Sequence, residues 1–397
     1  MSVEVTPSTA EEVAEALRDA AGQKHIVELG GDFTKRHFGG AIAPPDVVLS
    51  TRGLNQVLAY EPNDLTISVE AGIPFNVLKA TLRDKGQFLP LDPPFAENAT
   101  IGGVVAANSS GPRRRRYGTA RDMVIGMTFA TAAGKLVKSG GMVVKNVTGL
   151  DMGKLLIGSF GTLAAMTSIN FKVFPRPDQE RSFLAFANSL DPLLSLSRTV
   201  IKSQLQPVSI DLLDSGAAAL AGLSGKQYCL ALEASGNKSL VGRYKREWAG
   251  LAKEHGAGDF QALDQAGADS LWSKVHEFPA LATADSATAS VLRVASEPKK
   301  LGEMLKTAGS AGASAIATRA AAAIAYVSCP DLDSTQRCVT ACRAQGFPTI
   351  VEACPADQKS ALESWPHPGS QFAVMERIKD QLDPGRILNP GRLYNLL

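Results

Sequence analysis

The sequence predicts an α+β protein of two main domains, and three observations carry this prediction. The first 177 residues alternate short β-type segments with helical segments. From about residue 180, the predicted elements follow the order β-α-β-β-α-β, which is typical of a ferredoxin-like antiparallel sheet. The chain has 397 residues, which is too long for one small core. We therefore expect domains at 1–177 and 178–345, followed by a C-terminal segment at 346–397.

The elements of the first domain are predicted from their periodicity. A capping-box pattern at 8–12 opens a helix. Apolar strands are expected at 25–29 and 45–50, and residues 64–72 alternate apolar and polar side chains as a half-buried strand does. Residues 73–86 carry apolar side chains on one helical face and end at a glycine.

The remaining elements follow from the same patterns. Residues 123–137 predict a β-hairpin, and 152–177 predict a helix, a glycine turn and a strand that ends at Pro175 and Pro177. In the second domain, the expected strands are 182–187, 208–213, 228–235, 259–263 and 290–296, and the expected helices include 238–255 and 334–345.

Composition narrows the functional class. The 41 basic and 39 acidic side chains nearly cancel, so nothing favours binding to nucleic acid or direct insertion into a membrane. The N-terminus lacks the features of a signal peptide, and we expect a cytoplasmic protein, peripheral to the inner membrane only through partners. The histidines form no HxH or HExxH pair, and the cysteines lack a CxxCxxC run. We therefore expect no metal site.

Three glycine-rich loops in the first 160 residues are the candidate ligand-binding segments. They are Gly30-Gly31, Gly102-Gly103 and Gly140-Gly141 with the residues that follow each pair. Each can present backbone N–H groups to an anion, and none matches GxGxxG or GxxxxGK[ST]. Small residues and then Arg113–Arg116 follow the second loop, which suggests a bound phosphate group.

The motifs in these regions resemble those of a known flavoprotein family. They are "VEAGIPFNVLKATLRDKGQFLPLDPP", "ATIGGVVAANSSGPRRRRYGTARDMVIG", "GGMVVKNVTGLDMGKLLIGSFGTLAAMTSINFKVFPRP" and the terminal "LDPGRILNPGRLY". The chain resembles the flavoproteins with a PCMH-type FAD-binding domain, and within them the FAD-binding E subunits of glycolate oxidase. The resemblance implies two α/β subdomains that clasp FAD, a cap domain, and a tail that returns to the FAD domain.

The resemblance also implies roles for particular residues. Asp122 would help to close the flavin pocket, and a nearby arginine would offset the charge of the cofactor. The residues expected to line FAD and its pyrophosphate are Gly30, Gly31, Thr34, Pro93, Thr100, Ile101, Gly102, Gly103, Asn108, Ser110 and Gly111, with Lys145, Asn146 and Gly149 in the last loop.

The first loop departs from the family pattern. Asp32 and Phe33 separate Gly30-Gly31 from Thr34 and Lys35. Phenylalanine tolerates a positive φ poorly, and an aspartate repels a pyrophosphate, so either the loop bends differently or it holds the cofactor less tightly. Relatives that bind FAD covalently use a histidine in this loop, and none lies in this glycine turn. We expect non-covalent FAD.

Three functions remain open at this stage. The first is an FAD subunit of a glycolate-oxidising complex that relays electrons between a catalytic flavoprotein subunit and an iron–sulfur subunit. The second is a self-contained dehydrogenase of a small 2-hydroxy acid, and the third is an assembly subunit whose flavin site has degenerated. No catalytic residue is identified, although Arg293 is a weak candidate because its guanidinium can hold a carboxylate or form a structural ion pair.

Overall fold

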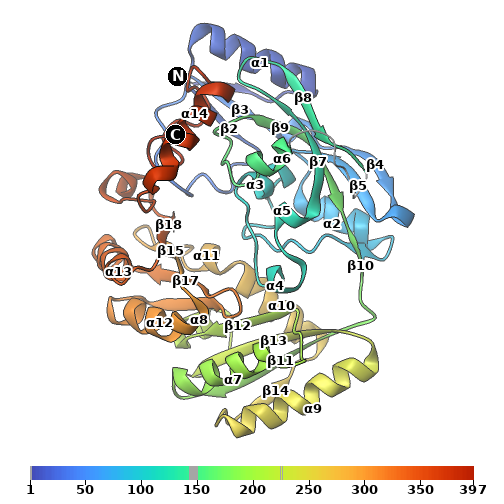
Figure 1. Ribbon diagram of the computed structural model, residues 1–397, viewed down its shortest axis with the longest axis vertical. Coiled ribbons are helices and arrows are strands. Elements are labelled where there is room, and N and C mark those ends of the chain that lie inside the picture. Colours follow the sequence, from blue (N-terminus) through green and yellow to red (C-terminus); the bar gives the residue numbers. More distant parts are fainter. Residues whose placement is uncertain (1, 143–150, 224, 226) are drawn as a thin grey trace. The chain divides into compact units, whose positions relative to one another are not determined.

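The computed structural model describes residues 2–142, 151–223, 225 and 227–397. The described chain divides into two compact units (Figure 1). Unit 1 comprises residues 1–110, 118–176 and 363–397, and unit 2 comprises residues 111–117 and 177–362. The expected domain limits lie after residues 177 and 345, and the chain passes between the units at 176/177 and 362/363, with a short excursion at 111–117.

Unit 1 contains a parallel sheet of order β1-β3-β2 and an antiparallel sheet of order β4-β5-β9-β7-β8. Its strands are β1 (Val3–Val5), β2 (Val27–Gly30), β3 (Val47–Ser50), β4 (Val57–Glu61), β5 (Thr66–Glu70), β6 (Gln87–Phe88), β7 (Val124–Ala130), β8 (Leu136–Gly140), β9 (Ala165–Lys172) and β10 (Phe174–Pro175). Its helices are α1 (Ala10–Gln23), α2 (Phe75–Arg83), α3 (Ile101–Ala106), α5 (Ala120–Met123), α6 (Met152–Leu156) and α14 (Phe372–Leu382).

One core joins the distant segments of unit 1. Thr9 caps α1 through its side chain, as the sequence pattern predicts. The apolar face of α1, with Val13 and Leu17, packs against Val27 of β2 and Leu49 of β3. Ile387 and Leu388, more than 300 residues away, belong to the same cluster, so the C-terminal tail is part of this core.

Unit 2 is built on an antiparallel sheet of order β14-β11-β13-β12-β16-β17-β15-β18. Its strands are β11 (Gln179–Ala187), β12 (Ser209–Leu213), β13 (Tyr228–Gly236), β14 (Phe260–Ala262), β15 (Ser290–Ala295), β16 (Ala315–Arg319), β17 (Ile324–Cys329) and β18 (Thr349–Ala353). Its helices are α4 (Arg114–Tyr117), α7 (Leu190–Lys202), α8 (Ser215–Leu220), α9 (Lys238–Glu254), α10 (Gln265–His276), α11 (Phe278–Leu281), α12 (Leu301–Ser310) and α13 (Leu332–Ala344).

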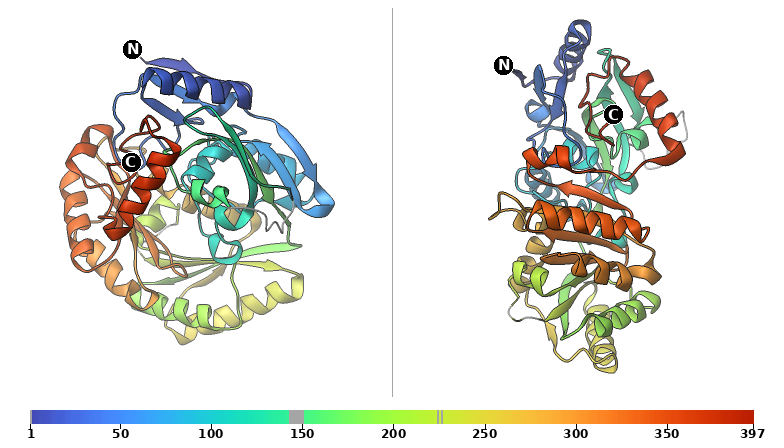
Figure 2. Two further views of the ribbon diagram at one scale, coloured as in Figure 1. Left: turned by 45° about the horizontal axis from the view of Figure 1, so that its top comes forward. Right: turned by 90° about the vertical axis from the view of Figure 1, so that its left-hand side faces the viewer.

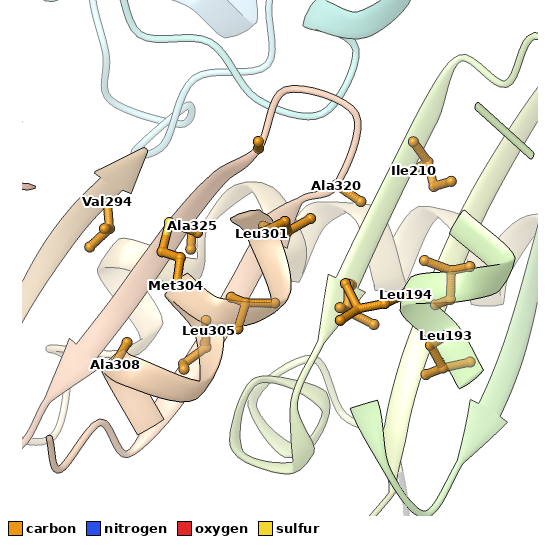
Figure 3. Close-up of a cluster of buried hydrophobic side chains, with 14 of the residues drawn as sticks. Leu193, Leu194, Ile210, Val294, Leu301, Met304, Leu305, Ala308, Ala320 and Ala325 are labelled. Atoms are coloured by element: carbon orange, nitrogen blue, oxygen red, sulfur yellow. The ribbon is translucent and has the colours of Figure 1, made fainter. Parts of the chain in front are cut away.

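The sheet of unit 2 consists of two ferredoxin-like halves. Strands β11 to β14 with α7 and α9 form the predicted β-α-β-β-α-β pattern, and β15 to β18 with α12 and α13 repeat it. The four helices lie along one face of the sheet (Figure 2), and their apolar side chains fill the core. Figure 3 shows Leu194 of α7 and Leu305 of α12 in that core. These features confirm the predicted α+β class.

A buried ion pair lies where the two halves join. Strands β12 and β16 are the neighbouring strands, and Asp211 pairs directly with Arg319 in their register. The Arg319 guanidinium donates to the Asp211 carboxylate and lies over the Tyr326 ring, 5.0 Å from its centroid. Burial raises the pKa of Asp211 to about 6, against the lowering effect of Arg319.

We expect this raised pKa to make the stability of unit 2 depend on pH. The folded state favours protonated Asp211, so this contribution is complete below about pH 4 and is lost as the pH rises through about 6. The free energy of unfolding of the native protein should therefore fall relative to that of Asp211→Asn between about pH 4 and pH 7. Urea unfolding followed through Trp248 and Trp272, both buried in unit 2, measures this difference, and parallel pH profiles would contradict it.

Candidate functional site

A pocket in unit 1, here called the glycine-loop pocket, brings together residues from distant parts of the chain. It contains about 730 Å³ of space free of protein atoms, part of it open to solvent. Small residues dominate its wall, so the main chain is accessible there. The lining residues are Leu29, Gly30, Gly31, Asp32, Phe33, Thr34, Lys35, Arg36, Thr51, Thr100, Gly102, Gly103, Ala106, Ala107, Phe160, Gly161, Ala164, Met166, Asn389 and Arg392.

The first loop requires both of its glycines because other residues press against them. A Cβ atom on Gly31 would lie 1.9 Å from Thr100 Oγ1, and one on Gly30 would lie 2.5 Å from the Phe33 ring. The backbone at Phe33 has φ of 52°, the left-handed conformation that a phenylalanine adopts poorly. The Arg36 guanidinium stacks over this ring, 4.6 Å from its centroid, and thereby helps to hold it.

The same loop leaves a run of donors unused. Among the residues that the structure describes, no acceptor engages the backbone N–H groups of residues 31–34. The carbonyl oxygens of Gly30 and Gly31 are engaged instead, by the hydroxyls of Thr51 at 3.3 Å and Ser50 at 2.8 Å. Consecutive free N–H groups form a concave site for an anion.

The second loop lies against the first and adds further lining residues. Thr100 precedes α3, and its hydroxyl accepts from the Gly103 N–H at 3.4 Å. Gly102 donates to the Ala71 carbonyl oxygen at 2.6 Å, and a Cβ atom there would lie 2.9 Å from that oxygen, so only glycine allows this approach. A Cβ atom on Gly103 would meet only the Thr100 hydroxyl within 4 Å, at 3.4 Å.

The C-terminal tail completes the pocket. The Asn389 side chain accepts from the Leu29 N–H at 2.8 Å and donates to the carbonyl oxygens of Leu29 and Phe160 at 3.0 and 2.8 Å. Arg392 donates to the carbonyl oxygens of Arg36 and Phe38. The sequence motif at 382–394 gave a resemblance but no role for these two residues, because the partners of a tail are known only in the fold.

A buried lysine fixes this tail. Lys379 of α14 donates to Asp383 and to the Thr162 carbonyl oxygen at 2.7 Å each, and to the Leu388 carbonyl oxygen at 3.0 Å. Asp383 in turn accepts from the N–H groups of Ile387 and Leu388. Burial lowers the pKa of Lys379, and the Asp383 carboxylate opposes that shift.

The expected site residues fall into three groups. Gly30, Gly31, Thr34, Thr100, Gly102 and Gly103 line the glycine-loop pocket, and Ile101 lies buried between two of them. Pro93, Asn108, Ser110, Gly111 and Asp122 do not line it. Lys145, Asn146 and Gly149 lie outside the described residues.

The residues away from the pocket have definite surroundings. Asp122 forms the capping box of α5, in which its carboxylate accepts from the Thr119 N–H at 2.8 Å. Asn108 has φ of 46° at the turn after α3. Ser110 is buried, and its hydroxyl has no partner among the described residues, as is also true of the Ser159 hydroxyl. Gly111 belongs to unit 2.

The arginine run belongs to unit 2 rather than to the glycine-loop pocket. Arg113 lies 3.0 Å from Glu180 and 2.7 Å from Glu233, and Arg115 donates to Gln206 at 3.1 Å. Glu233 is buried on β13 and also accepts from Ser209. Arg113 therefore neutralises a buried carboxylate within its own unit.

Replacing Arg113 with alanine should destabilise unit 2. The change leaves the buried Glu233 without its cation, which should lower the free energy of unfolding by about 1–3 kcal/mol. Urea unfolding followed by tryptophan fluorescence measures this loss. Arg198→Ala, at an exposed position of α7, is the matched control and should change stability by less than about 0.5 kcal/mol. Equal midpoints for the two variants would show that the ion pair contributes nothing.

Arg293 is engaged in an ion pair. Its Nε donates to Glu352 at 2.7 Å across the β15–β18 ladder, and its side chain remains about one-third exposed. Two roles are proposed for Arg293, binding a substrate carboxylate or forming a structural ion pair, and the contact with Glu352 supports the ion pair. The described residues contain no cluster of His, Cys, Asp or Glu that could bind a metal ion, and the five cysteines are buried and free. No helix in the described part of the chain is long and apolar enough to cross a membrane.

Comparison with known proteins identifies two consecutive domains. Residues 1–140 match the family described as "FAD binding domain", and residues 176–315 and 356–393 match "FAD linked oxidases, C-terminal domain". In solved structures, 4-ethylphenol oxidase from Gulosibacter chungangensis aligns over 99% of this chain and 89% of its own, with a TM-score of 0.75 and 16% identity. p-Cresol methylhydroxylase aligns over 98% of this chain and 88% of its own, with the same TM-score and identity. These structures establish the fold, which is the expected PCMH-type architecture.

Curated relatives match about half of the chain. Glycolate oxidase subunit GlcE of Escherichia coli is 36% identical over 49% of this chain and 55% of its own length. Glycolate oxidase subunit GlcD of Bacillus subtilis is 29% identical over 53% of this chain and 45% of its own. D-2-hydroxyglutarate dehydrogenase of Xanthomonas citri is 32% identical over 48% of this chain and 40% of its own. The aligned region thus spans about half the length of these relatives.

Proposed function

We propose that this chain, which carries an FAD binding domain and the C-terminal domain of FAD linked oxidases, is the FAD-carrying subunit of an assembly that oxidises glycolate or a related small 2-hydroxy acid. Its cofactor is FAD. The observation that carries the proposal is the glycine-loop pocket, whose wall of small residues and free N–H groups suits the phosphate-bearing part of FAD. Similarity to glycolate oxidase subunits GlcE and GlcD supports the substrate class and the assembly.

The residues that line the pocket also fit a cofactor held without a covalent bond. Among the residues that line the pocket, none is a His, Cys or Tyr that could form a covalent bond to a flavin. We therefore propose that FAD is held non-covalently, with Thr34, Lys145, Asn146 and Gly149 among its contacts.

Bound FAD supplies the electron transfer, and the protein supplies its position and local charge. In the proposed assembly, a catalytic flavoprotein subunit delivers electrons and an iron–sulfur subunit receives them. The free N–H groups of the first loop would hold the anionic part of the cofactor, and the tail, through Asn389 and Arg392, would keep that loop in place.

The charges of unit 2 favour a relay over a self-contained dehydrogenase. The carboxylates of Glu233 and Glu352 are each held by an arginine, and Asp211, whose pKa is raised by burial, lies beside Arg319 with only 1% of its surface exposed and so has no access to a substrate. None of the strands of the described sheet carries a histidine. A dehydrogenase needs a base positioned to accept a proton from the substrate, and an ion-paired carboxylate is a poor one. Arg293, paired with Glu352, stays a candidate for holding a substrate carboxylate in the alternative function.

The third candidate function is an assembly subunit whose flavin site has degenerated, and the contacts of the first loop argue against it. Arg36 supports Phe33 at its positive φ, and Arg52 lies 2.9 Å from Asp32, so both departures from the family pattern have a local partner.

The absorbance spectrum of the purified chain tests these functions. Flavin bands that stay oxidised under anaerobic glycolate until a catalytic partner subunit is added are the expected result. Bands that bleach with glycolate alone would replace the relay with a self-contained dehydrogenase. A chain that shows no flavin bands even after reconstitution with FAD would be an assembly subunit.

A further inference from the structure

Asp32 lies within the run of free N–H groups in the first loop. Its carboxylate is about one-quarter exposed, and it lines the glycine-loop pocket. A negative charge here opposes the binding of any anion by the N–H groups of residues 31–34. The sequence alone therefore suggests a weakened site, and the structure shows a countercharge.

Three consecutive residues contact three consecutive residues of this loop. The Ser50 hydroxyl donates to the Gly31 carbonyl oxygen at 2.8 Å, and the Thr51 hydroxyl donates to the Gly30 carbonyl oxygen at 3.3 Å. Arg52 Nη1 lies 2.9 Å from Asp32 Oδ1. We call residues 50–52 the loop clamp. It engages the carbonyl and carboxylate oxygens of the loop, while the N–H groups stay free.

We propose that Arg52 is a positioning residue for FAD, which cancels the charge of Asp32 so that the first loop can accept the pyrophosphate. The proposal rests on the glycine-loop pocket being the FAD site. An exposed ion pair contributes little to stability, so the role of this pair lies in the electrostatics of the pocket. One uncancelled charge about 8 Å from an anion, at an effective dielectric constant near 30, weakens binding about tenfold.

The test is a charge series at the two positions. Apoprotein is titrated with FAD, and the dissociation constant is obtained from flavin fluorescence at low and high salt. The variants are Arg52→Ala, Arg52→Lys, Asp32→Asn and the double variant Asp32→Asn/Arg52→Ala. Arg83→Ala, at an exposed position of α2 outside the pocket, is the control for a change of net charge. Circular dichroism verifies that each variant is folded.

The expected pattern follows the local charge. Arg52→Ala should weaken FAD binding about tenfold at low salt and less at high salt, because salt screens the uncancelled Asp32. Arg52→Lys and the double variant should bind within about twofold of the native protein, and Asp32→Asn should bind as tightly or more tightly. The control should bind as the native protein does.

Other patterns overturn the inference in distinguishable ways. If the double variant binds as weakly as Arg52→Ala, Arg52 acts by itself and not through Asp32. If Arg52→Ala binds as the native protein does, the pair has no role in binding, while the proposed function stands. If the native apoprotein does not bind FAD at all, both the inference and the proposed function fail.

Discussion

Replacing Gly31 with alanine should weaken FAD binding by about ten- to hundredfold or more. The new Cβ would lie 1.9 Å from Thr100 Oγ1, so the first and second loops must move apart. Forcing an extra carbon into a packed site costs about 1–3 kcal/mol, and here the displaced atoms form the wall of the glycine-loop pocket. Titration of the apoprotein with FAD gives the dissociation constant, and the flavin-to-protein absorbance ratio after purification gives the loading.

Gly22→Ala is the matched control for this change. Gly22 lies in α1, and a Cβ atom there would meet nothing within 4 Å. The control should retain full FAD loading and gain up to about 1 kcal/mol from the better helix propensity of alanine. Equal loading of the two variants would mean that the Gly31–Thr100 contact does not shape the site.

Replacing Lys379 with methionine should lower the free energy of unfolding of unit 1 by about 3–5 kcal/mol. The change removes three donated hydrogen bonds and leaves the buried Asp383 without its cation. FAD loading should fall as well, because the tail that carries Asn389 and Arg392 loses its anchor. Chemical unfolding followed through Trp365, the tryptophan of unit 1, measures the stability loss.

Two further variants serve as controls for the effect of Lys379→Met. Lys79→Met, at an exposed position of α2, should change stability by less than about 0.5 kcal/mol. Lys379→Met/Asp383→Leu removes both buried charges and should recover part of the loss, because an apolar pair can replace a buried ion pair. If Lys379→Met unfolds at the native midpoint, the anchoring role assigned to this lysine is wrong.

Local pattern was enough to predict much of the fold. The alternation at 64–72 corresponds to β5, and the apolar face at 73–86 corresponds to α2. The edge strand β4 was not predicted, because an exposed edge carries no buried face to give a period-two signal; Leu58 within it is half exposed. The second half was predicted only as separate alternating elements, and its junction with the first half was not predicted, because the pairing of β12 with β16 joins residues more than 100 positions apart.

The candidate site was predictable where it depends on small residues. Glycines at Gly31 and Gly102 mark close approaches of main chain, and such approaches leave a local signature in the sequence. The ion pair of Arg113 has no such signature in the sequence, because an arginine side chain suits a phosphate and a buried carboxylate equally well. Ser50, Asn389 and Arg392 also lacked a signal, because each acts on a loop distant in sequence.

The discontinuous make-up of unit 1 has a consequence for biosynthesis. Its core and the wall of the glycine-loop pocket include residues between 387 and 392, whereas the second loop is made some 290 residues earlier and the first loop more than 350 residues earlier. Chains emerge from the ribosome N-terminus first, so these early loops must wait while all of unit 2 is translated. Nascent chains stalled before residues 389–392 emerge should therefore lack a complete FAD pocket, so FAD can load only after this tail has been synthesised.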